Sequence, residues 1–345
     1  MHATFQGWIP RLSPDLQLRH EIDINLMLTN GLMSKYGWAD TRVRDSAEHG
    51  LLLTKNSDNL QQTVPMLWVL AFYHHVASHR KTVRTLSDQL FALCEKSGEH
   101  GLLVACHTMR GAASMIDGDM AAAASSCEQV VRDYDPALYA NHGYWFGLDT
   151  RVWSQASLSN VCWLCDPDSA PAFAHAQQAV AYARTLNHLP SLGIALLHLA
   201  LLHQFSADAD GVREVSREML MLAQKYGLPV VEAYAETLHS WASRDAVRLE
   251  RALARLKHAG CMLRHSYFTS LAAGLDFQAG NTAAALTRLD HSLQLCAQLG
   301  EQWSKPMLLI QRASYAGALP GFDAESARLD LQQAIALAGA VGMRR

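Results

Sequence analysis

The sequence predicts an all-α fold, a right-handed α-solenoid built from about eight antiparallel helix pairs. Apolar residues recur with a helical period, as in the series Leu192, Leu196, Leu199 and Leu202, and runs of alternating β-branched residues are absent. Residues that end helices follow these periodic stretches at short intervals. Half of the 345 residues are hydrophobic and only 18% are charged, as expected when stacked helices bury apolar side chains on two faces.

The expected helix ends are residues that readily adopt a left-handed backbone, which is what the C-terminal cap of a helix requires. They are Gly98, Gly118, Asn187, Gly227, Gly260, Gly280 and Gly300. The connections between periodic stretches are short, so neighbouring helices are expected to be antiparallel. The predicted pairs span approximately residues 14–55, 59–96, 99–133, 148–186, 188–226, 228–259, 263–299 and 301–341.

Two segments share an internal spacing that is typical of a helical repeat. In RGAASMIDGDMAAAASSCEQVVRDYDP, Gly118 is followed five residues later by Ala123, and in AAGLDFQAGNTAAALTRLDHSL, Gly280 is followed by Ala285. The glycine ends the first helix of a pair, and the alanine allows the second helix to approach it closely. This is the spacing of a tetratricopeptide unit, in which three or more units bury a continuous core.

One segment interrupts the pattern. Residues 134–148, YDPALYANHGYWFGL, are rich in aromatic residues, Gly and Pro, and are expected to form a long irregular loop that is functional or covers a groove. The repeat array is predicted to cover residues 14–341, either as one array or subdivided near this segment. Residues 1–13 are expected to form an N-terminal extension, and residues 342–345 a C-terminal tail.

The order and spacing of these segments resemble the C-terminal tetratricopeptide region of bacterial multidomain signal-transduction ATPases. Matching stretches include INLMLTNGLMSKYG (24–37), HGLLVACHTMRGAASMIDGDMAAAASSCEQVVRDYDP (100–136) and ARTLNHLPSLGIALLHLALLHQF (183–205). In that family a winged-helix DNA-binding domain or an adenylate cyclase domain precedes an AAA-like nucleotide switch, and the repeats follow. The resemblance implies a non-catalytic module that binds proteins or senses effectors for a transcriptional or signalling regulator. The chain is then a piece of such a regulator or a truncated paralogue; the alternative is a free-standing scaffold or adapter.

Motifs and charge favour a binding protein over an enzyme. The sequence has no glycine-rich phosphate loop and no G-x-S-x-G motif, so no cofactor and no catalytic residue are assigned. The net charge is −3, and the basic cluster Arg80, Lys81 and Arg84 is expected to be a solvated helix start rather than a nucleic-acid contact. A minor alternative is a histidine-based metalloenzyme, because His75 and His79 are expected to share a helix face. No third ligand is visible, and no metal site is assigned.

Cysteine usage and hydropathy indicate a cytoplasmic protein. The seven cysteines lie in apolar stretches and are expected to be small buried hydrophobic residues, as in a reducing compartment. Cys162 and Cys165 form a C-x-x-C motif at a predicted helix end, and we expect two core cysteines there. The N-terminus does not resemble a signal peptide, and the longest apolar stretches are too short to cross a membrane.

Aromatic residues are the remaining binding candidates. Most tryptophans fall on the first helix of a pair, which lines the concave face of such a solenoid and suits a protein or peptide partner, or a small effector. The alternative for each tryptophan is a place in the core between repeats. The stretch 144–155, YWFGLDTRVWSQ, offers an apolar platform beside charges, and two histidines are expected to line the array. The candidate binding residues are Trp68, Tyr144, Trp145, Asp149, Arg151, Trp153, His198 and His203. A last repeat without a polar outer face would also favour self-association.

Overall fold

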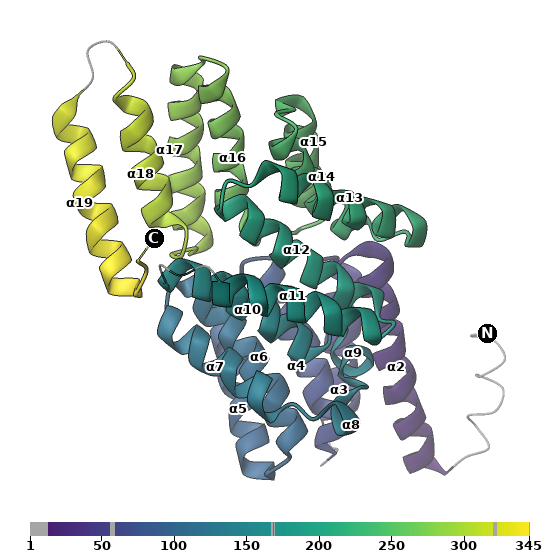
Figure 1. Ribbon diagram of the computed structural model, residues 1–345. Helices are drawn as coiled ribbons and strands as arrows, with labels where there is room; N and C mark the ends of the chain where they lie inside the picture. The colour runs from purple at the N-terminus through teal and green to yellow at the C-terminus, as the bar shows by residue number, and fades with distance from the viewer. Residues whose placement is uncertain (1–12, 56–58, 167, 169, 320–322, 345) are drawn as a thin grey trace.

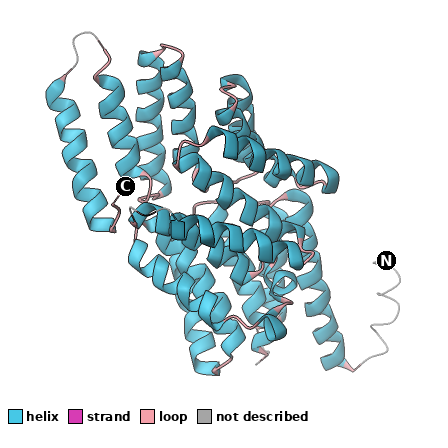
Figure 2. Ribbon diagram, in the orientation of Figure 1, coloured by secondary structure: helices cyan, strands magenta, loops and turns pink. Residues whose placement is uncertain are grey.

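The computed structural model describes residues 13–55, 59–166, 168, 170–319 and 323–344. Within these ranges the chain forms eighteen helices and no strand (Figure 1 and Figure 2). The all-α prediction is confirmed. None of the described helices is long and apolar enough to cross a membrane. Residues 1–12, most of the expected N-terminal extension, lie outside the described residues.

Sixteen of the helices in the described part form eight consecutive pairs. They are α2 (Pro14–Tyr36) with α3 (Thr41–Leu53), α4 (Leu60–Val76) with α5 (Arg80–Ser97), α6 (His100–Asp117) with α7 (Met120–Asp133), α10 (Thr150–Cys165) with α11 (Ala170–Thr185), α12 (Leu189–Phe205) with α13 (Ala209–Tyr226), α14 (Pro229–Ala242) with α15 (Ala246–His258), α16 (His265–Gln278) with α17 (Thr282–Leu299), and α18 (Lys305–Ala316) with α19 (Ala324–Val341). The predicted repeat solenoid is confirmed, whereas its right-handed sense stays a prediction.

The spacing from glycine to alanine works as expected at the turn between α6 and α7. Gly118 has a left-handed backbone (φ +85°), and Asp119 caps α7 by accepting a hydrogen bond from the backbone of Ala122. Ala123 is fully buried. A Cβ atom on Gly111 would lie only 2.7 Å from Cys127 Sγ, so the two helices touch where their side chains are smallest.

First and second helices of the pairs differ in how much they bury. The first helices α4 (LQQTVPMLWVLAFYHHV) and α12 (LPSLGIALLHLALLHQF) are apolar nearly all round and are buried on most sides. The second helices α5 and α13 bury one face and expose the other. The helices α4 and α12 therefore lie inside the molecule with neighbours on both sides, as their continuous hydrophobicity requires.

The segment 134–148 is more ordered than expected. It contains two short helices, α8 (Pro136–Tyr139) and α9 (His142–Phe146), so the prediction of a long irregular loop is wrong. Phe146 and Leu148 are fully buried, and α10 packs directly against α6 and α7 across this segment. A subdivision of the array near this segment stays a prediction.

The superhelix closes on itself because later loops bind the ends of earlier first helices. The backbone N–H groups of Met262 and Leu263, between α15 and α16, donate to the carbonyl of Val76 at the end of α4. Gln302, between α17 and α18, donates in the same way to Ile116 near the end of α6. The first and sixth pairs also meet where α14 contacts α2.

The residues after α19 repeat this contact. Gly342 ends the helix, Met343 is buried, and the Arg344 backbone N–H donates to the carbonyl of Leu164 at the end of α10 (3.0 Å). The C-terminus accordingly lies beside α10 in Figure 1. Residues 342–344 are therefore packed against an earlier repeat rather than forming a tail that extends from the array.

Candidate partner-binding site

Closure of the superhelix buries two tryptophans of the first helices, Trp68 and Trp153, and one in the loop between α17 and α18. Trp68 is 0% exposed, and its Nε1 donates to the carbonyl of Ala105 (3.0 Å). Trp153 is 4% exposed, and its ring meets that of Phe72 edge to face at 5.1 Å. Trp303 is also fully buried. For these three tryptophans the alternative of a place in the core between repeats is confirmed, and none of them forms an open binding surface.

The two candidate histidines on α12 are in different surroundings. His198 faces a cavity at the centre of the molecule, and burial holds its pKa well below its usual range. His203 lies near the end of the helix, where its Nδ1 is 2.8 Å from Asp208 Oδ2. Asp208 also caps α13 by accepting from the backbone of Gly211. His203 therefore helps to join two helices, and His198 belongs to the interior.

Asp149 is a buried helix cap. Its carboxylate accepts from the backbone N–H of Val152 (2.9 Å) and from the hydroxyl of Tyr134 (2.6 Å). Burial raises the pKa of Asp149 and, together with the carboxylate, that of Tyr134. Asp149 thus starts α10 and holds Tyr134 beneath the surface. Its carboxylate oxygens are used inside the molecule and do not face a surface where a partner protein could bind.

A row of aromatic rings connects two of the other candidate residues, Trp145 and Arg151. Trp145 stacks on His142 (6.1 Å between ring centroids), and His142 stacks on Tyr139 (5.0 Å). Tyr139 meets Tyr134 edge to face, and Tyr134 in turn meets Tyr182 (6.2 Å). The last ring of this row, Tyr182, lies beneath a cation. The row runs from Trp145 through His142, Tyr139 and Tyr134 to Tyr182.

The cation is the guanidinium of Arg151, which lies 4.5 Å from the centre of the Tyr182 ring. Both side chains line a surface groove of about 360 Å³ between α10 and α11. Two amides lie in its wall, where Gln155 Nε2 donates to Gln178 Oε1 (2.8 Å). The groove therefore combines one positive charge, an aromatic face and amide groups.

Tyr144 is the most exposed aromatic candidate. It is 60% exposed on α9, with its ring 5.4 Å from that of His188. The structure thus places Arg151 in the groove, Trp145 at the far end of the aromatic row and Tyr144 on the surface of the same segment. The sequence analysis missed Tyr182 and Gln178, because their meeting with α10 depends on the register between two antiparallel helices and no local pattern marks it.

The histidine pair proposed for a metal does not share a helix face. The helix α4 ends at Val76, so His79 lies beyond it and its Nδ1 contacts His74 Nδ1 (2.9 Å). His75 points inward, where its Nδ1 contacts the guanidinium of Arg80 (3.2 Å). Among the described residues no three histidine, cysteine or acidic side chains are grouped so that they could hold a metal ion.

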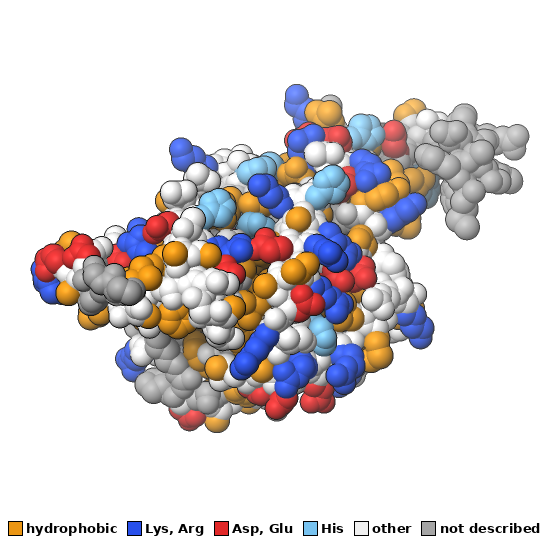
Figure 3. Space-filling view, turned by 90° about the horizontal axis from the view of Figure 1, so that it is seen from above, with side chains coloured by type: hydrophobic (Ala, Val, Ile, Leu, Met, Phe, Trp, Pro, Cys, Tyr) orange, Lys and Arg blue, Asp and Glu red, His pale blue; other side chains and the backbone are white. Residues whose placement is uncertain are grey.

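The basic cluster at the start of α5 is only partly solvated. Arg80 is buried and pairs with Asp117 (2.9 Å), so the expectation of a solvated residue is wrong for Arg80. Arg84 is exposed and reaches the same carboxylate. On the face seen in Figure 3, Lys and Arg side chains are mixed with Asp and Glu.

The fold is that of a tetratricopeptide-type helical-repeat solenoid. Among solved structures, the crystal structure of a Rap protein complexed with competence and sporulation factor is similar to this chain, with a TM-score of 0.62 and 12% sequence identity. The similarity covers 75% of this chain and 71% of the Rap chain. At this identity it establishes the fold alone. No protein-family model and no curated protein sequence matches the chain.

Proposed function

We propose that this chain is a non-catalytic interaction module that binds a peptide segment of a partner protein in the groove between α10 and α11. The observation that carries the proposal is the groove of about 360 Å³ in which the Arg151 guanidinium covers the Tyr182 ring. An arginine held in this way pairs well with a carboxylate, because the ring fixes it and its planar donors match the acid. The expected partner segment is therefore acidic.

The repeat fold and the resemblance support this function. Helical repeats expose long surfaces suited to protein recognition, and the similar Rap protein is complexed with competence and sporulation factor. The resemblance to multidomain signal-transduction ATPases supports a finer proposal, in which binding biases the output of a bacterial regulator. A free-standing adapter would use the same groove. We therefore propose the partner site on the side of the α10–α11 pair and not on the expected concave face, because aromatic side chains fill the centre of the molecule.

A peptide-display selection on the full chain tests the proposal. Peptides selected from a random library are expected to carry Asp or Glu, and their affinity should fall about tenfold on R151A or Y182A, as for a central contact of an interface. R184A is the matched control, because Arg184 lies on the same helix α11 but pairs with Glu218. Peptides that bind R151A and Y182A as tightly as the unchanged chain would exclude this groove.

A further inference from the structure

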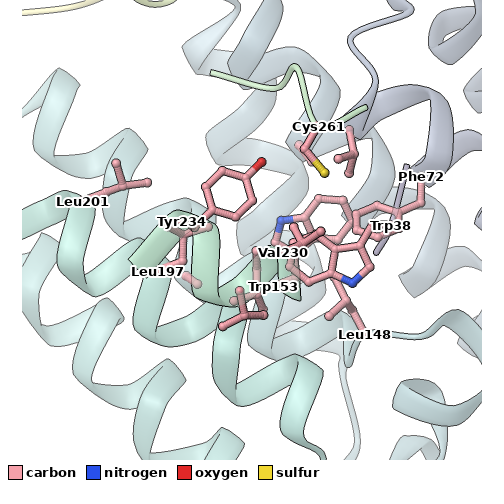
Figure 4. Packing of buried hydrophobic residues seen from close by; sticks show 14 of the residues in the cluster. Trp38, Phe72, Leu148, Trp153, Leu197, Leu201, Val230, Tyr234 and Cys261 are labelled. Atoms are coloured by element: carbon pink, nitrogen blue, oxygen red, sulfur yellow. The ribbon is translucent and has the colours of Figure 1, made fainter. Parts of the chain in front are cut away.

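Burial suppresses the reactivity of most of the seven cysteine thiols. Cys261 lies among the aromatic side chains of the core, close to Trp38 (Figure 4), and burial raises its pKa to about 12. Burial likewise raises the pKa of Cys127 to about 12 and that of Cys296 to about 11. The thiolate is the reactive form of cysteine, so thiols in such surroundings are inert.

Cys94 and Cys106 differ from these thiols because their sulfur atoms are in contact. The two Sγ atoms are 3.2 Å apart, and the Cys106 thiol donates its hydrogen to Cys94. This hydrogen bond lowers the pKa of Cys94, whereas the pKa of every other cysteine is raised. Cys94 is therefore the thiol of this chain that most readily becomes a thiolate, with a second thiol beside it.

The contact between the two thiols joins consecutive helix pairs. Cys94 lies in the last turn of α5, the second helix of its pair, and Cys106 lies in α6, the first helix of the next pair. Only Gly98 and Glu99 separate the two helices. A disulfide has an S–S distance of about 2.0 Å, so the sulfur atoms would have to approach by about 1.2 Å. A small shift at the end of α5 is enough for that approach.

The end of α5 also offers a route to the Cys94 sulfur. Residues 95–100 are exposed, and a surface groove of about 470 Å³ is lined by Leu93 and Ser97 on either side of Cys94 in the sequence. The Cys94 carbonyl accepts from Ser97 Oγ (2.8 Å) and from the backbone N–H of Gly98 (3.2 Å). Helix ends fray more readily than helix centres, and opening of this last turn would expose the buried sulfur to a small oxidant.

We propose that Cys94 and Cys106 are a site of reversible oxidation, at which a hydroperoxide such as hydrogen peroxide forms a disulfide between α5 and α6. The bond ties the second helix pair to the third, and a dithiol reductant restores both thiols. The proposal does not depend on the function proposed for the groove between α10 and α11.

The oxidation proceeds in two steps. The Cys94 thiolate attacks one oxygen of hydrogen peroxide, the O–O bond breaks, and the departing hydroxide takes up the proton that Cys94 released to become water. Cys94 is then a sulfenic acid. The Cys106 sulfur attacks the Cys94 sulfur, the S–S bond forms, the S–O bond breaks, and the oxygen leaves as water with the Cys106 proton. The two thiols together lose two electrons, and one peroxide molecule is reduced to two water molecules.

Mass spectrometry of the unchanged full chain tests the proposal. After treatment with a small excess of hydrogen peroxide, the intact mass should fall by about 2 Da and return with dithiothreitol. Trypsin cuts after Arg84, Lys96 and Arg110, so peptides 85–96 and 97–110 carry one cysteine each and should be found linked. The same treatment in urea should give mixed pairings, because no fold then selects a partner. An unchanged mass, mixed pairings in native buffer, or a bond between Cys162 and Cys165 in place of this one overturns the proposal.

Variants separate the roles of the two thiols. C106S should stop at the sulfenic acid, which dimedone traps on Cys94, and C94S should give neither the disulfide nor a trapped product. C127S is the matched control, because Cys127 is 1% exposed like Cys106 and lies in the neighbouring helix α7. It should lose about 2 Da as the unchanged chain does. A disulfide that still forms in C94S, or one that is lost in folded C127S, contradicts the assignment.

Discussion

Buried histidines are the residues whose protonation this fold controls most strongly. His142 packs among the rings of the aromatic row, with its Nδ1 2.8 Å from Thr150 Oγ1. Burial lowers its pKa to about 3, and holds those of His75 and His198 well below their usual range. The neutral forms are therefore required for folding, since each charged form would lose its hydration inside the molecule.

We predict that the protein loses stability as the pH falls below 6.5. In that range the unfolded chain binds protons that buried His142 does not bind, so the folded state is progressively disfavoured until the pH approaches 3. His142 alone should reduce the free energy of unfolding by about 2 kcal/mol between pH 7 and pH 5. Urea titrations at pH 7, 6 and 5 measure this slope, which H142Q should reduce. An unchanged slope in H142Q would show that other groups dominate it.

The polar candidates illustrate what residue patterns can and cannot reveal. Asp149 and Arg151 stand two residues apart at a helix start, and the sequence indicated that they matter. As Asp149 caps α10 and binds Tyr134 below the surface, only Arg151 remains in the groove. A carboxylate that caps a helix and one that binds a ligand have the same local sequence signal, and the side on which the next helix packs decides between them.

At the scale of elements, small residues at the helix crossings determine how closely the two helices of a pair approach each other. Gly111 lies against Cys127, and Gly31 in α2 has no atom within 4 Å of the position that a Cβ would take. Both glycines lie inside helices and have the same helical backbone. They therefore differ only in how closely neighbouring atoms pack against them.

We predict opposite effects for alanine at these two glycines. G111A should destabilise the fold by about 1–3 kcal/mol, because the added methyl group forces α6 and α7 apart. G31A should stabilise it by about 0.5–1 kcal/mol, because alanine favours the helix and meets no neighbour. Thermal and urea unfolding of the two variants measure the difference. If both were stabilised alike, α6 and α7 would not be in the close contact described above.

At the scale of the whole molecule, three later segments dock on earlier first helices. The loops after α15, α17 and α19 bind near the ends of α4, α6 and α10 in turn. This regular offset turns the array into a closed superhelix with a filled centre, and part of the outer side of α19 is exposed. Leu331 and Ile335, one turn apart on α19, are 43% and 73% exposed there.

We predict that this outer side mediates self-association. Exposed apolar side chains such as these form a surface that a second copy can cover. The mass from light scattering should exceed that of a 38.0 kDa monomer at micromolar concentration and return to it in I335E. M221E is the control, because Met221 is 60% exposed on α13, away from the last pair. A monomeric wild-type chain, or equal effects of both variants, would contradict the prediction.

The sequence by itself determined the helical class, the helix pairs and most of their ends. These depend on local physics: the period of apolar residues, the left-handed backbone at positions such as Gly118 and Gly280, and the small residues that follow them. The tertiary structure alone decided which faces remain open. Contacts between pairs far apart in the sequence, such as that of the loop before α16 with the end of α4, close the molecule and bury Trp153, and no local pattern encodes them.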